Sequence, residues 1–85
     1  MAKKPDPRSA RERVAANVRR LRLERSLSQE GMAELADFHR TYVSQLERCV
    51  TNISIDGLER LAAALGVDVI DLLAQPPTPV RGNRG

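Results

Sequence analysis

Four polar side chains fall on one face of a short helix that we predict in the middle of the chain. They stand at positions i, i+1, i+4 and i+5, and they are Arg40, Thr41, Ser44 and Gln45. A helix gathers these positions on one side, whereas Val43 and Leu46 point to the other. Guanidinium groups bind guanine, carboxamides bind adenine, and hydroxyls bind bases or phosphates. A purely solvated face typically carries glutamate–lysine pairs four residues apart, and this one has none. We therefore expect these side chains to contact base edges in the major groove of double-stranded DNA.

The elements that must position this face form a helix-turn-helix. Ser28 is a good N-cap for a helix that ends near Ala36. A turn at residues 37–38 leads into the third helix, from about Arg40 to Arg48. A helix that lies in the major groove reads bases with its N-terminal residues, which here include Arg40 and Thr41.

Three further helices complete the predicted fold. Ser9 and Glu12 form a capping-box pattern that opens a first helix. Ser54 caps a fourth helix that stops at Gly66, and Asp68 caps a short fifth helix. No alternating strand pattern occurs, so we predict an all-α, compact five-helix domain. We assign residues 1–8 to a flexible basic arm, residues 9–75 to the helix-turn-helix domain, and residues 76–85 to a disordered tail rich in proline and glycine.

The charge of the 85-residue chain is unevenly distributed. Residues 1–25 hold nine basic and three acidic side chains, net +6, whereas residues 53–75 hold four acidic side chains and one arginine, net −3. The basic end is suited to face a polyanion. The single cysteine, Cys49, fits a reducing compartment. No apolar run reaches the roughly 20 residues that span a bilayer, so we expect a cytoplasmic protein that does not enter a membrane.

Nothing in the sequence predicts an enzyme. One histidine, one cysteine and scattered carboxylates provide no metal-ligand spacing, no phosphate-binding loop and no nucleophile–base pair. We expect no metal, no cofactor and no catalytic residues.

The middle of the chain resembles a known family. The stretch "LSQEGMAELADFHRTYVSQLERCVTNISIDGLERLAAALGV", with the match extending over about residues 14–74, is similar to the Cro/cI-type (XRE) helix-turn-helix regulators, whose fold is lambda-repressor-like. The part "HRTYVSQLER" especially resembles controller proteins of restriction–modification systems. The resemblance implies a transcriptional regulator that binds DNA.

The resemblance also implies roles for individual residues. Base contacts fall on Arg40, Thr41 and Gln45, with Ser44 beside them. Contacts to the sugar-phosphate backbone are expected from Gln29, His39, Tyr42, Arg48 and Asn52. Arg22 and Glu47 match a partly buried ion pair that ties the first helix to the end of the third. For Tyr42 the alternative is a core aromatic with a solvated hydroxyl, and for Arg22 and His39 it is a surface position.

The chain departs from the family pattern at three positions. Asp37 stands at a position that is usually glycine with a positive φ, which aspartate tolerates better than most residues. Cys49 also replaces a glycine, and there we expect a distorted cap or a different exit from the third helix. His39 replaces a capping serine or threonine.

The sequence at the C-terminal end of the domain predicts a contact between two copies of the chain. The segment "VDVIDLLA" offers more apolar side chains than one face of a short helix can bury. With Leu72 turned inward, we expect the surplus to form a homodimer interface at Val67, Val69, Ile70 and Leu73. The alternative is that all of them pack within the monomer.

We therefore predict a sequence-specific regulator that binds a palindromic operator as a homodimer, with half-sites roughly 34 Å apart. It would act as a restriction–modification controller or a phage-type repressor, with RNA polymerase as a further candidate partner. Two alternatives keep the fold. One is an antitoxin that regulates its own synthesis, which the short tail without an amphipathic stripe disfavours. The other is an interaction module that has lost DNA binding, which Arg40 and Gln45 disfavour.

Overall fold

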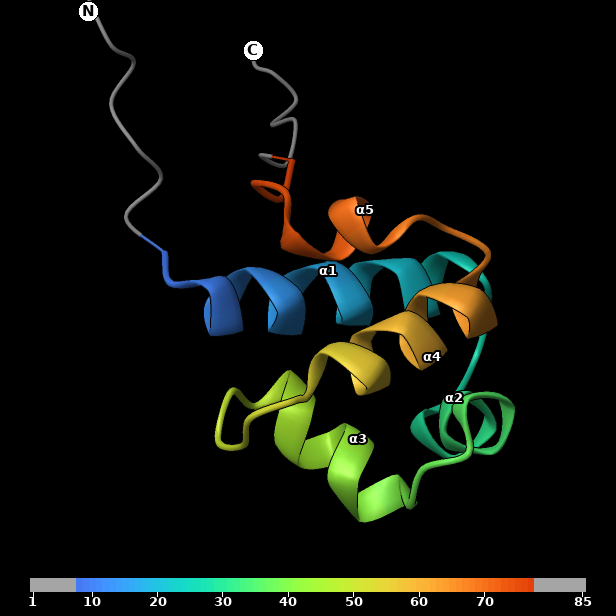
Figure 1. Cartoon of the computed structure of the whole chain (residues 1–85). Helices are drawn as coiled ribbons and strands as arrows, with labels where there is room; N and C mark the ends of the chain where they lie inside the picture. The colour runs from blue at the N-terminus through green and yellow to red at the C-terminus, as the bar shows by residue number, and fades with distance from the viewer. Residues whose placement is uncertain (1–7, 78–85) are drawn as a thin grey trace, which may run out of the picture.

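The computed structural model describes residues 8–77, and within them every regular element is an α-helix (Figure 1). In chain order they are α1 (Ala10–Glu24), α2 (Gln29–Ala36), α3 (Arg40–Glu47), α4 (Ile55–Leu65) and α5 (Val69–Leu73). The prediction of an all-α domain with five helices is confirmed. The arm predicted for residues 1–8 lies outside the described residues except for its last position, and so does the tail from residue 78 onward.

Four of the five helices begin at a side-chain cap. Ser9 accepts a hydrogen bond from Glu12 N while the Glu12 carboxylate accepts one from Ser9 N, which completes the predicted capping box of α1. Ser28 and Ser54 cap α2 and α4. Asp68 caps α5, where Asp71 closes a second capping box. Helix α3 is the exception, because its N-cap residue His39 makes no side-chain cap bond.

The four longer helices all end in the same way. The chain turns through a left-handed residue, and the N–H that follows it reaches back five residues to a helix carbonyl, as in a Schellman motif. The left-handed residues are Ser26, Asp37, Cys49 and Gly66, with φ of 56°, 61°, 63° and 72°. The returning hydrogen bonds are Leu27 N to Arg22 O, Phe38 N to Ala33 O, Val50 N to Gln45 O and Val67 N to Ala62 O.

This geometry shows how the chain accommodates two of its three departures from the family pattern. Asp37 takes the left-handed conformation that the position requires. The expectation of a distorted cap or a different exit at Cys49 is wrong, because Cys49 N donates to Leu46 O at 3.0 Å and Val50 N to Gln45 O at 3.0 Å. The α3 exit is therefore a regular one in which a cysteine carries the backbone strain that a glycine avoids.

The core lies between all five helices. Its largest fully buried apolar side chains are Met32, Leu46, Leu61, Leu65 and Leu72. Helices α2 and α3 pack on each other and on the α1–α4 pair, while α5 packs on α1 and α4. Figure 1 shows the α2–α3 unit on one side of α1 and α4, and α5 on the opposite side.

Helix α5 is held in place by a buried asparagine of α1. The Asn17 side chain is 1% exposed, and its Nδ2 donates to the Leu72 carbonyl at 3.0 Å and to the Ala74 carbonyl at 2.9 Å. These bonds satisfy carbonyls at the C-terminus of α5, which a five-residue helix cannot pair by itself. Pro76, the first residue of the predicted tail, is buried. None of the helices within residues 8–77 is long and apolar enough to cross a membrane.

Candidate nucleic-acid interface

Helix α3 buries one side and leaves the other available to a ligand. Val43 and Leu46 are fully buried against the core. On the opposite side Arg40 and Thr41 are exposed, and Ser44 and Gln45 are partly exposed. The structure thus brings the four residues predicted to contact bases onto one accessible face, with the two most exposed at the N-terminal end of the helix.

The residues predicted to contact the DNA backbone surround this face. His39 and Arg48 flank α3 at its two ends, and both are exposed, as is Asn52 in the loop that follows. An imidazole at one end of the helix, a guanidinium at the other end and an amide beyond it are suited to phosphate oxygens. Their contacts with DNA stay a prediction.

A buried ion pair joins the end of α3 to α1. Arg22 Nε lies 2.6 Å from Glu47 Oε2, and Arg22 Nη2 lies 3.0 Å from Glu47 Oε1. The Arg22 side chain is 9% exposed and that of Glu47 is 3% exposed. The hydrogen bonds to Glu47 raise the pKa of the Arg22 guanidinium. Arg22 Nη1 also donates to the Leu27 carbonyl at 2.8 Å. One arginine therefore ties α1, the α1–α2 connection and α3 together.

Gln29, at the first position of α2, also binds this ion pair. Its Nε2 donates to Glu47 Oε1 at 3.1 Å. A carboxamide nitrogen has two N–H groups, so this bond uses one of them. The phosphate contact predicted for Gln29 needs the other, and it stays a prediction.

Tyr42, which is predicted to contact the DNA backbone, is hydrogen-bonded within the protein. Its hydroxyl donates to the Asn52 carbonyl at 2.7 Å, and burial raises its pKa, although the nearby Arg60 cation acts in the opposite direction. A phenol has a single proton to donate. A hydrogen bond from Tyr42 to a phosphate would therefore replace the bond that holds the α3–α4 loop.

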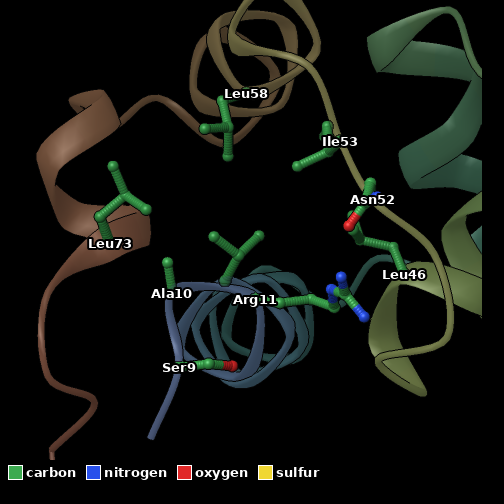
Figure 2. A pocket seen from close by; sticks show the side chains of 9 residues that line it. Ser9, Ala10, Arg11, Leu46, Asn52, Ile53, Leu58 and Leu73 are labelled. Atoms are coloured by element: carbon green, nitrogen blue, oxygen red, sulfur yellow. The ribbon is translucent and has the colours of Figure 1, made fainter.

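The residues predicted for the dimer contact divide between core and surface. Val67, Val69 and Leu73 are partly buried against the core, whereas Ile70 is 70% exposed. Leu73 lines an open hollow of about 590 Å³ together with Leu58 and Ile53, between the start of α1 and the α3–α4 loop (Figure 2). Of the four residues predicted for the dimer contact, Ile70 is thus the one that is largely exposed, and Leu73 contributes to the wall of the hollow.

Two residues that organise the site, Asn17 and Arg60, were not identified from the sequence. Asn17 is a polar residue on the buried face of α1, and that position in the helical pattern is the signal that would have found it. Arg60 interacts with the turn between α2 and α3. The only sign of Arg60 in the sequence is that it is the one basic residue in the acidic segment of residues 53–75.

The α2–turn–α3 unit, with a polar outer face on α3, defines a helix-turn-helix DNA-binding domain. Residues 18–72 match the helix-turn-helix family HTH_3. The chain therefore belongs to this family of XRE-type helix-turn-helix regulators, as the resemblance indicated, and it is a DNA-binding transcriptional regulator.

Similar proteins include regulators from several bacteria. Control protein C.BamHI of Bacillus amyloliquefaciens is 49% identical over 57 residues, which cover 66% of this chain and 70% of that protein. The crystal structure of the hypothetical transcription factor NHTF from Neisseria matches with a TM-score of 0.79 and 41% identity, covering 89% of this chain and 87% of the other. The restriction-modification controller protein C.AhdI from Aeromonas hydrophila matches with a TM-score of 0.70 and 34% identity, covering 73% and 94%.

Proposed function

We propose that this chain is a sequence-specific regulator that binds a palindromic operator as a homodimer and controls a restriction–modification system. The observation that carries the DNA-reading part is the outer face of α3, where the exposed Arg40 and Thr41 lie at the N-terminal end of the helix. A recognition helix presents that end to the base edges. In this arrangement Ser44 and Gln45 read the neighbouring positions.

The base-reading and backbone-binding roles can be separated by two arginine variants. Arg40→Ala is expected to lower discrimination between a preferred and a random duplex by about 1–3 kcal/mol, because it removes a base contact. Arg48→Ala is expected to weaken both duplexes alike and to lower the salt slope by about 0.9, because it removes a phosphate contact. Competition binding over a range of salt concentrations measures both effects. Equal losses on random DNA in the two variants would contradict these roles.

The homodimer is proposed from the apolar surface around α5. Ile70 is among the most exposed large apolar side chains, and Leu73 lines the neighbouring hollow. Helix α5 lies on the side of the domain opposite to α3 (Figure 1), so a two-fold contact centred on Ile70 leaves both recognition helices free. A symmetric contact of this kind matches the symmetry of a palindrome.

Sedimentation of a single variant tests the interface. Ile70→Asp places a charge in the proposed contact, and we expect a folded monomer that no longer binds the operator. Leu35→Asp is the control, since Leu35 is 59% exposed but lies on α2, and we expect this variant to remain a dimer. An Ile70→Asp protein that stays folded and dimeric would place the interface elsewhere.

The role as a controller is supported by likeness to proteins with that name, C.BamHI and C.AhdI. The genes on either side of this one provide the test. We expect an endonuclease and a methyltransferase, and operator DNA upstream of one of them should compete for the protein. A neighbouring toxin gene would favour the antitoxin alternative.

A further inference from the structure

Arg60, in the middle of α4, reaches across to the turn that precedes the recognition helix. Its Nε donates to the Ala36 carbonyl at 3.1 Å, and its Nη2 donates to the Asp37 carbonyl at 2.6 Å. These carbonyls lie at the C-terminal end of α2, where a helix attracts cations and has unpaired acceptors. One guanidinium thus binds both residues at which the chain leaves α2.

The same guanidinium also contacts the aromatic pair of the turn. Arg60 Cζ lies 4.1 Å from the centroid of the Phe38 ring, within the range of a cation–π interaction. The Phe38 ring in turn packs on Tyr42 with centroids 4.9 Å apart. Because the Tyr42 hydroxyl donates to the Asn52 carbonyl, the contacts continue from α4, across the first turn of α3, to the loop that follows it.

Helix α3 has few local features that fix where it begins. His39 provides no side-chain cap, the first turn has no acidic residue, and the helix is eight residues long. A helix this short is marginal without tertiary support. Arg40 and Thr41 directly follow the turn that Arg60 binds, so the direction of these two side chains depends on how firmly that turn is held.

We propose that Arg60 is a positioning residue for DNA recognition: it holds the α2–α3 turn and thereby directs the start of the recognition helix at the bases. This inference rests on the proposed function of α3. Arginine is suited to the role because its planar fork can donate to two carbonyls while its face stacks on a ring. A lysine ammonium in its place keeps the charge but has no planar face to stack on Phe38.

The experiment compares a duplex selected by the wild-type chain from a random-sequence library with an unselected duplex of the same length. The variants are Arg60→Lys and Arg60→Met, and the control is Glu59→Met, an exposed neighbour on α4. The quantity measured is the dissociation constant of the unselected duplex divided by that of the selected duplex, over a range of salt concentrations. Partial unfolding weakens binding to both duplexes by the same factor, so a residue that only stabilises the fold does not change this ratio.

We expect both Arg60 variants to lower the ratio by about tenfold, the scale of one lost base contact, with an unchanged salt slope, and Glu59→Met to leave the ratio unchanged. The proposal is overturned if both Arg60 variants keep the wild-type ratio. It is also overturned if Arg60→Lys behaves as the wild type while Arg60→Met lowers the salt slope by about 0.9 on both duplexes, because Arg60 would then bind a phosphate directly.

The wild-type chain distinguishes failure of this inference from failure of the proposed function. A wild-type protein that selects no preferred duplex contradicts sequence-specific binding itself. A wild-type protein that selects one, together with Arg60 variants that discriminate equally well, contradicts only the role of Arg60.

Discussion

Removing the Glu47 carboxylate should destabilise this domain far more than a surface substitution. In Glu47→Ala, Arg22 loses the acceptor of its Nε and Nη2 groups and keeps only the Leu27 carbonyl, bonded to Nη1. Gln29 loses its acceptor as well. The Arg22 side chain is 9% exposed, so its charge cannot be fully rehydrated without a change in the fold.

The size of the effect follows from this geometry. Breaking a buried ion pair by removing one partner costs about 3–5 kcal/mol, whereas small domains have a total stability of about 5–15 kcal/mol. We therefore expect Glu47→Ala to lose much of the free energy of unfolding. Glu59→Ala, at an exposed position of α4, is expected to change it by less than about 0.5 kcal/mol.

The assay is urea denaturation followed by circular dichroism, with Arg22→Met combined with Glu47→Ala as the informative variant. The double substitution removes the unpaired charge and leaves an apolar side chain in its place, so we expect it to recover at least about 1 kcal/mol relative to Glu47→Ala. A double variant no more stable than Glu47→Ala alone would refute the reasoning, because the cost would then not come from the isolated guanidinium.

Substitutions at three further positions test the fold around the site, each by urea denaturation. Cys49→Gly should gain about 0.5–1 kcal/mol by relieving the left-handed strain, whereas Cys49→Ala keeps the strain; equal gains in both would point to the thiol instead. Tyr42→Phe should lose about 1 kcal/mol with the bond to the Asn52 carbonyl; weaker DNA binding at unchanged stability would instead support the phosphate contact. Asn17→Ala should lose about 1–3 kcal/mol, because it strands carbonyls at the end of α5, and a neutral effect would show that water replaces the amide.

Much of the fold could be predicted from the sequence because the deciding interactions are local. The caps at Ser9, Ser28, Ser54 and Asp68 join residues two or three positions apart, so their patterns are visible in a short window. The polar face of α3 follows from helical spacing in the same way. The Arg22–Glu47 pair spans 25 residues, and only the resemblance to a family indicated it.

What the sequence by itself determined is thus where the helices begin and which face of α3 carries donors and acceptors, since backbone geometry sets both within a few residues. Only the tertiary structure decided how that face is held. Arg60 meets the α2–α3 turn across 24 and 23 residues, and Asn17 meets the end of α5 across 55 and 57 residues. Such contacts arise when helices pack, and a polar side chain gives no local sign of which distant carbonyl it will reach.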